Sequence, residues 1–276
     1  MALPLGIGVP PNTPHAISVS LPTWNDNVGY EEGDDRVLSA MVSGYPRFFI
    51  HLSIRKLASI CQHKYALQSE HCFLFPARSI AEQCRDFIRH KSSHPIQPRL
   101  IDLFVPPSHH LHIVVVPVDQ FKLAKQFWQH TGFGISSRQA EKCLALLPDD
   151  WSTPRPTAPS HNKHYAVKSI TSSSPDLISS DHTTYLEERY GRNLPLSAVS
   201  SAKRALRRRI ARTLLHDDGQ PDPGADGPDI TGTSSRGVKS VTEDDVYLYP
   251  CGMAAIWSAH KLLRDTRPEA KSVCFG

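Results

Sequence analysis

Apolar positions divide the chain into one buried strand and several amphipathic helices. Residues 111–118, LHIVVVPV, are almost all apolar and β-branched, which predicts a strand buried on both faces of a parallel sheet. Helical spacing of apolar residues predicts helices over 119–130, 136–147 and 197–215. In the third helix we expect the following apolar residues to face inward: Val199, Ala202, Leu206, Ile210 and Leu214.

A second pattern lies near the C-terminus. Residues 246–263, VYLYPCGMAAIWSAHKLL, predict a short strand, a tight turn at Pro250-Cys251-Gly252 and an amphipathic helix. A glycine at such a turn lets a ligand approach the backbone, and the first N–H groups of a helix are unpaired and carry partial positive charge. The turn is therefore a candidate phosphate site, although a plain strand-to-helix connection has the same pattern.

An earlier segment, 44–90, repeats this order of features. Tyr45-Pro46-Arg47 is similar in form to Tyr190-Gly191-Arg192, and FLFPA at 73–77 is similar to YLYPC at 247–251. The spacing between the two features is larger in the second copy by the length of the polar segment 216–244. The pattern predicts an internal strand–turn–helix repeat.

The two copies differ at the turn. The first has Arg78-Ser79 where the second has Gly252-Met253, and side chains there would crowd a phosphate held by backbone amides. We therefore predict that the first copy is structural and the second binds the ligand. Tyr45 and Arg47 remain alternative phosphate ligands.

Composition suggests how the chain is divided. Of 276 residues, 39% are hydrophobic and 23 are proline, which predicts a globular core with long loops. We predict an N-terminal α/β region at 1–147, a Ser/Thr/Pro-rich linker at 148–184, and a second domain at 185–276 with a flexible insert at 216–244. Neither a membrane-spanning run nor a secretory signal is recognisable.

Cysteine and histidine give little sign of chemistry. The six cysteines form no C-x-x-C pair, which favours buried thiols in a reducing, cytoplasmic setting over disulfides or a nucleophile at Cys251. His109, His110 and His112 precede the buried strand, but no third ligand is evident, so no metal site is predicted.

The helix at 197–215 offers an alternative function. Six of the ten residues in 203–212 are Lys or Arg, enough for salt-dependent contacts with nucleic acid phosphates. No aromatic residue or nucleic-acid-binding motif accompanies them, and the net charge is only +4. A solvated helix face is the simpler interpretation, and a non-catalytic interaction protein is the alternative.

Several phrases resemble the cysteine/methionine-metabolism family of pyridoxal-phosphate (PLP) enzymes. PCGMAAI at 250–256 resembles its Ser-Gly-Met-Ala-Ala-Ile segment, and ERYGRN at 188–193 resembles its Tyr-Ser-Arg…Asn-Pro motif. SVSLPTWNDNVGYEEGDDRV and GYPRFFIH resemble its fungal cystathionine γ-synthase branch. The resemblance implies that the backbone of Cys251, Gly252 and Met253 holds the PLP phosphate. It also implies that Tyr190 and Arg192 reach this phosphate across a subunit interface, in a homo-oligomer.

The resemblance further implies a reaction and a fold. The reaction is γ-replacement of O-acylhomoserine by cysteine, a step of transsulfuration and methionine biosynthesis. The fold is a type I PLP-transferase parallel sheet with flanking helices, here incomplete. Such enzymes need a Schiff-base lysine and an aspartate at the pyridine nitrogen, and no lysine in residues 1–276 has the family's context for that role. We therefore expect the N-terminal portion of a longer enzyme, inactive at this length, with its catalytic lysine beyond residue 276.

Overall fold

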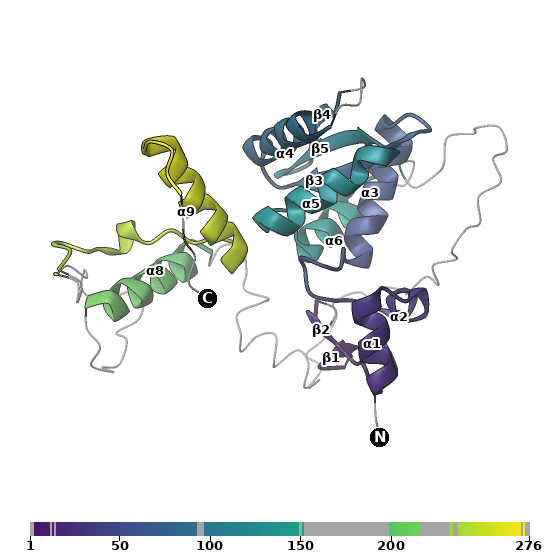
Figure 1. Cartoon of the computed structure of the whole chain (residues 1–276), viewed down its shortest axis with the longest axis horizontal. Coiled ribbons are helices and arrows are strands. Elements are labelled where there is room, and N and C mark those ends of the chain that lie inside the picture. The colour runs from purple at the N-terminus through teal and green to yellow at the C-terminus, as the bar shows by residue number, and fades with distance from the viewer. Residues whose placement is uncertain are drawn as a thin grey trace. The chain divides into compact units, whose positions relative to one another are not determined.

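The computed structural model (Figure 1) forms two compact units, residues 1–183 and 184–276, each with its own core. It describes residues 3–11, 13, 15–92, 97–148, 151, 199–215, 232–233, 237–271 and 273. Most of the predicted linker and most of the predicted insert lie outside these residues, so the domain boundaries stay predictions.

The first unit begins with a small capped motif. Strands β1 (Gly8–Val9) and β2 (Ser18–Val19) pair antiparallel, and helices α1 (Trp24–Glu32) and α2 (Asp35–Ala40) follow. Thr23 caps α1 in a capping box, in which its hydroxyl accepts from the Asp26 N–H and the Asp26 carboxylate accepts from the Thr23 N–H. These exchanged bonds satisfy donors that the first helical turn leaves unpaired.

A three-layer α/β sandwich makes up the rest of this unit. Its sheet has the strand order β3-β5-β4, and both neighbouring pairs are antiparallel. Its elements, in chain order, are α3 (Leu52–Tyr65), β3 (Glu70–Phe75), α4 (Arg78–Lys91), β4 (Arg99–Val105), β5 (His109–Pro117), η1 (Val118–Gln120), α5 (Phe121–Thr131) and α6 (Ser137–Leu146).

The sheet connections form a split βαβ motif. Because β3 and β4 are both antiparallel to β5, they run in the same direction, and α4 connects them. The central strand β5 then enters between them after a tight turn at 106–108. The sequence correctly predicted a buried strand at 111–118, but its assignment to a parallel sheet was wrong.

Helices cover both faces of this antiparallel sheet, which explains the continuous apolar run of β5. Leu111, Ile113 and Val115 belong to one core cluster with α3 and α6, whereas Val114 and Val116 belong to another with α4 and α5. All five side chains are fully buried. A strand with one face in water alternates between apolar and polar residues. A strand covered by apolar layers on both faces has apolar residues throughout, whether its neighbours are parallel or antiparallel.

Two predicted helices in this unit are confirmed. The pattern at 119–130 becomes the short η1 turn followed by α5, and the pattern at 136–147 becomes α6. Phe127 and Trp128 of α5 are buried, and Ala140 of α6 is fully buried. Helical periodicity therefore located both the elements and their inner faces.

The second unit is smaller, and more of its apolar side chains are exposed to solvent. It contains α8 (Val199–Leu215), the 3₁₀ turn η4 (Glu243–Asp245) and α9 (Gly252–Thr266). Its core cluster consists of Ala211, Leu215, Val241 and Val246. The helix predicted at 197–215 is confirmed, but its predicted inner face is wrong because α8 buries Arg208, Ala211 and Leu215 instead. Four of the apolar residues expected inside are between 36% and 54% exposed: Val199, Leu206, Ile210 and Leu214.

The strand predicted at the start of 246–263 is also wrong. Residues 246–249 form no strand, whereas the turn and the following helix α9 are present. A strand needs a hydrogen-bonded neighbour, and no described residue pairs with this segment in a sheet. The second copy of the repeat therefore keeps the turn and helix of the first but lacks its strand, and the repeat itself stays a prediction.

An ion pair between the buried Glu70 and the half-exposed Arg99 joins the starts of β3 and β4. The Glu70 carboxylate accepts hydrogen bonds from Arg99 Nη2 at 2.5 Å and from the Leu67 N–H at 2.8 Å. Arg99 Nη2 also donates to the Tyr65 carbonyl at 3.2 Å. Burial alone would raise the pKa of Glu70, but the Arg99 and Leu67 hydrogen bonds outweigh it, so the pKa lies below its ordinary value of 4.5.

We expect Glu70→Gln to lower the free energy of unfolding at neutral pH by about 1.5–3 kcal/mol, because a buried charged hydrogen bond is lost. A lowered folded pKa stabilises above the ordinary carboxyl pKa, and this contribution disappears as the pH falls through the folded pKa. The difference between wild type and variant should therefore shrink in acid. Urea unfolding at several pH values measures it.

The matched control is Glu82→Gln. Glu82 pairs with Arg78, and their side chains are 40% and 57% exposed. Loss of such a surface pair should cost at most about 0.5 kcal/mol. Equal losses in the two variants at neutral pH would show that the Glu70 pair has no special role.

Candidate functional site

The N-terminus of α9 has the features expected of a phosphate site. Its N-cap residue, Cys251, is extended, with φ −157° and ψ 165°, and provides no side-chain cap hydrogen bond. The first backbone bond of the helix runs from the Ala255 N–H to the Cys251 carbonyl at 3.2 Å. The N–H groups of Gly252, Met253 and Ala254 precede this bond and therefore have no acceptor within the helix. Such groups attract anions.

Gly252 leaves open space in front of these donors. A Cβ atom built at Gly252 would meet no atom within 4 Å, so packing within this unit does not require a glycine here. Gly44 is a contrasting case, because its Cβ would lie 2.6 Å from the Cβ of Phe49. The missing side chain at Gly252 therefore leaves room for a ligand and fills no structural need in this unit.

The first copy of the repeat has a different helix start. Ala77 is also an extended N-cap without a side-chain cap bond, and α4 then begins with Arg78. The Arg78 guanidinium binds Glu82 at 3.0 Å and also binds Asp102. Its charge is thus already paired within the sandwich. This arrangement agrees with the prediction that the first copy is structural.

The predicted side-chain ligands of the phosphate are not all described. Tyr190 and Arg192 lie outside the described residues. The alternative pair, Tyr45 and Arg47, lies in the first unit. Arg47 Nε donates to the Gln129 carbonyl at 2.8 Å, which ties this arginine to α5, and Tyr45 is 45% exposed. Arg47 therefore has a structural partner, and Cys251, Gly252 and Met253 are the predicted site residues that the structure brings together.

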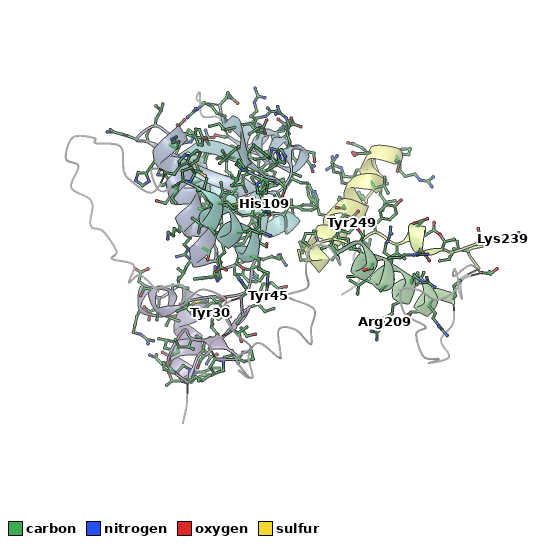
Figure 2. All side chains as sticks on the ribbon, turned by 180° about the vertical axis from the view of Figure 1, so that it is seen from behind. Tyr30, Tyr45, His109, Arg209, Lys239 and Tyr249 are labelled. Atoms are coloured by element: carbon green, nitrogen blue, oxygen red, sulfur yellow. The ribbon has the colours of Figure 1, made fainter. Side chains whose placement is uncertain are left out.

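The Arg-rich helix α8 is largely engaged within its own unit. Arg204 Nε lies 3.0 Å from Glu243, Arg207 Nη1 lies 3.7 Å from Asp244, and Arg208 Nε lies 4.0 Å from Glu243. Arg208 is 1% exposed. These pairs explain why α8 turns its cationic side toward η4, and they reduce the charge available to nucleic acid. Arg209 remains exposed on this helix (Figure 2).

A cavity of 340 Å³ also lies beside α8. Lys203 and Arg207 line it together with residues 246–248, which lead toward the Gly252 turn. Tyr249, the next residue, is 41% exposed and can be located in Figure 2. Positive charge therefore flanks the segment that precedes the candidate phosphate site.

The histidines at the start of β5 have a structural explanation. His112 Nδ1 and Asp102 Oδ1 are 2.6 Å apart and face each other across the β4–β5 pair. The His110 ring lies 4.9 Å from the ring of Phe104, its partner in the same pair. In the described part of the chain, no three His, Cys, Asp or Glu side chains are grouped to hold a metal ion.

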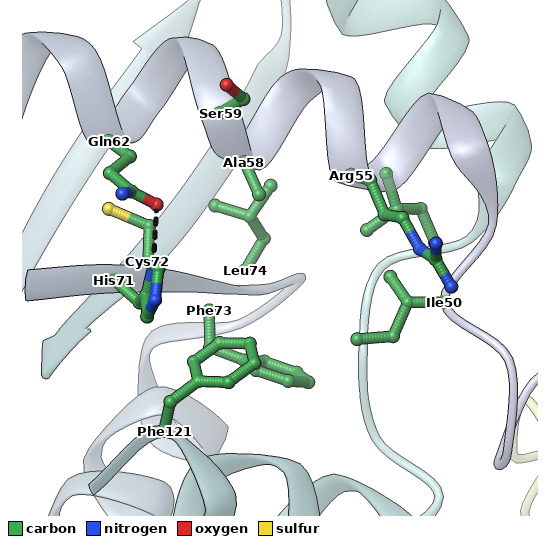
Figure 3. Close-up of a pocket in the computed structure, with 11 residues that line it drawn as sticks. Ile50, Arg55, Ala58, Ser59, Gln62, His71, Cys72, Phe73, Leu74 and Phe121 are labelled. Carbon is green, nitrogen blue, oxygen red and sulfur yellow. Dashed lines mark hydrogen bonds between the residues drawn. The ribbon is translucent and has the colours of Figure 1, made fainter. Parts of the chain in front are cut away.

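A second cavity, which the sequence did not reveal, lies in the sandwich (Figure 3). It measures 180 Å³ and lies between α3, the edge strand β3 and the start of α5. Its lining is mostly apolar, with Arg55 toward one end and the hydrogen-bonded pair Gln62–His71 toward the other. Only the spacing of Arg55, Ala58 and Gln62 along one helix face could have signalled it.

The sandwich coincides with a known family domain. Residues 53–136, from α3 to the end of the loop after α5, match the family model of the fungal trans-sulfuration enzyme, N-terminal domain. No solved structure matches the chain. The match covers the described sandwich except α6 and the first residue of α3, and none of the second unit.

Relatives extend the likeness over the whole chain. A cystathionine γ-synthase-like enzyme of Amanita muscaria is 44% identical, over 99% of this chain and 46% of its own length. A cystathionine γ-synthase of Neurospora crassa is 37% identical, over 99% of this chain and 52% of its own length. The chain is similar to the N-terminal portion of fungal cystathionine γ-synthase-like proteins. It spans about half the length of these γ-synthase-like relatives.

The relatives do not all share one reaction. An alanine racemase of Aspergillus violaceofuscus is 31% identical over 94% of this chain and 43% of its own length. The likeness to γ-synthase-like proteins therefore assigns the family more firmly than the reaction. Among the described helices, none is long and apolar enough to cross a membrane.

The described cysteines differ sharply in their surroundings. Burial raises the pKa of Cys61 and of Cys72 to about 12, and it also raises the pKa of Cys84 and Cys143. All four are buried in the sandwich, as the sequence predicted, whereas Cys251 is half-buried. A thiol must ionise to act as a nucleophile.

We therefore expect the four buried cysteines to resist iodoacetamide at mildly alkaline pH in the folded protein, because they are both protonated and inaccessible. Cys251 should be alkylated first among these five. Peptide mass spectrometry after timed alkylation measures each site, and the urea-unfolded chain is the control in which all five should react. Rapid labelling of Cys61 or Cys84 in the folded chain would contradict the described core.

Proposed function

We propose that this chain supplies the phosphate-anchoring part of a PLP-dependent enzyme of the cystathionine γ-synthase type. The N-terminus of α9, where Cys251 gives no side-chain cap hydrogen bond and Gly252 leaves open space, is the observation that carries this proposal. A phosphate dianion would find several converging backbone donors there, at the positive end of a 15-residue helix.

The residues present fit a cofactor phosphate. Gly252 and Met253 would hold it through their N–H groups, with Cys251 at the preceding position, and Tyr190 and Arg192 would add side-chain bonds. An arginine can bind a phosphate through two parallel bonds, which fixes its orientation as well as its position. When bound, PLP stabilises negative charge that develops at the α-carbon of an amino acid. This chain would orient the cofactor, and the Schiff-base lysine would come from elsewhere in the enzyme.

The proposed reaction is γ-replacement of O-acylhomoserine by cysteine, in the cytoplasm. The proposed fold of the second unit is the beginning of a type I PLP-transferase sheet, in a homo-oligomer. The open apolar faces of α8 and α9 support this assembly, since Leu206, Ile256 and Leu262 are each more than half exposed. Exposed apolar residues of this size on neighbouring elements of one unit are candidates for burial against another protein surface.

We expect residues 1–276 alone to show no turnover of O-acylhomoserine and cysteine, because the relatives are about twice as long. A hybrid in which residues 1–276 replace the matching region of the Neurospora crassa relative should form cystathionine. Product formation by mass spectrometry compares the two proteins. Turnover by the chain alone at the rate of the hybrid would contradict the proposal that residues 1–276 only anchor the cofactor.

The second test asks which residues hold the PLP phosphate. In the hybrid, Gly252→Val should weaken PLP retention about tenfold or more, because the side chain fills the space in front of the helix donors. Arg192→Ala should weaken it by about 1.5–3 kcal/mol through loss of a charge-assisted bond. Cofactor absorbance per subunit after dialysis measures retention.

Two controls accompany these variants. Ile256→Val, on the first turns of the same helix, should leave PLP content unchanged because Ile256 is 64% exposed and presents no group to a phosphate. Charge reversal of Arg209 and Arg212 should also leave it nearly unchanged. If the reversal variant loses its cofactor while Gly252→Val keeps it, the anchor lies on α8 and the proposed site is wrong.

A further inference from the structure

The cavity in the sandwich lies at the outer edge of the sheet. Because β3 is an edge strand, the side chains on its two faces can both border the same opening. Cys72 and Leu74 reach the cavity from the face that α3 covers, and Phe73 reaches it from the face of α5. The cavity therefore enters the sandwich between its two helical layers, in a domain far in sequence from Gly252.

Arg55 brings a positive charge to this cavity. Arg55 projects from α3 at the end beside Ile50 (Figure 3). Its guanidinium carbon lies 4.6 Å from the ring centroid of the buried Phe49, which holds the side chain by a cation–π contact. In the described part of the chain no Asp or Glu pairs with it. Partial burial lowers the pKa of Arg55, although the side chain keeps exposed surface at the mouth of the cavity.

The remaining lining is complementary to a short apolar chain. Ile54, Ala58 and Leu74 border the middle of the cavity, and Phe73 and Phe121 border it from below in Figure 3. At the far end the His71 Nδ1 and Gln62 Oε1 atoms, 3.0 Å apart, already satisfy each other. Arg55 and Gln62 are seven positions apart on α3, so the two ends are separated by about 10 Å.

The size and charge of the cavity limit its ligand. A volume of 180 Å³ is the space of about six water molecules, well below the ~300 Å³ or more of sites for drug-sized molecules. No acidic residue lines it, so an ammonium group would find no partner there.

We propose that this cavity binds a small monocarboxylic acid with an apolar chain and no amino group, with its carboxylate on Arg55 and its chain over Phe73, Leu74 and Phe121. A bidentate carboxylate would neutralise the Arg55 guanidinium. The apolar chain would fill the middle of the cavity, and burial of its surface would supply the rest of the affinity. This site does not depend on the proposed PLP anchor.

Hexanoate is the probe that tests this proposal, with two matched comparisons. Hexanamide has the same chain without the charge, and norleucine has the same chain and carboxylate with an added ammonium group. We expect hexanoate to bind the 276-residue chain with a Kd of about 1 mM or lower. Both comparison compounds should bind about tenfold more weakly or worse, because each lacks part of the complementarity. NMR amide shifts of the isotope-labelled chain measure the three titrations at constant ionic strength.

Variants locate the site. Arg55→Gln should weaken hexanoate binding about tenfold or more, and Ala58→Leu should weaken it by filling the cavity while leaving the arginine in place. Lys56→Gln, the exposed neighbour on α3, is the matched control and should leave binding unchanged. Unchanged amide spectra outside the cavity would establish that each variant is folded.

Four outcomes of these titrations would contradict the proposed carboxylate site. Equal affinities for hexanoate and hexanamide would exclude a role for the Arg55 charge. Tighter binding of norleucine would show that an amino group is accepted. Saturable shifts at α8 or α9 with none at α3 and β3 would place the carboxylate elsewhere in the chain, as would equal losses in Lys56→Gln and Arg55→Gln.

Discussion

Burial of β5 on both faces is the constraint on which the first unit depends. Leu111, Ile113 and Val115 point into one helical layer, and Val114 and Val116 point into the other. Both core clusters thus depend on a single strand. Both helical layers are needed to exclude water from its two faces. At about 25 cal/mol per Å² of apolar surface removed from water, such a strand contributes more than any single polar contact in the unit. The Glu70–Arg99 ion pair adds a polar contact between the starts of β3 and β4.

Local pattern predicted much of this arrangement, because periodicity reports which faces of an element are buried. It located β5, α5, α6 and α8, as well as the turn at Gly252. The local pattern did not predict strand direction, because buried residues such as Val114 and Val115 are equally compatible with a parallel and an antiparallel sheet. Direction depends on the neighbours, and the pairing of β3 and β4 with β5 is not visible in the β5 sequence itself.

The failures in the second unit have a related cause. Val199, Leu206 and Ile210 have helical spacing, but the described part of this unit offers α8 only the η4 segment and a small core. The face that meets η4 is selected by the ion pairs of Arg204 and Arg208 with Glu243. Residue type gave the phosphate-site candidate at Gly252, because a glycine at a helix start lets a ligand approach the backbone donors. The cavity beside Arg55 had no such signal, since cavities arise from the spacing of elements and not from a motif.

The order of strands has a consequence for how the sandwich is made. The central strand β5 is the last of the three in the chain, so neither β3 nor β4 has its hydrogen-bonding partner strand until residues 109–117 are available. During synthesis, the preceding segment therefore exposes two apolar strands whose hydrogen-bonding edges are open. The sheet forms only when β5 enters and closes two long loops together, a non-local step that slows folding. The domain is thus expected to fold late and all at once after its central strand has left the ribosome, with no stable half-sheet along the way.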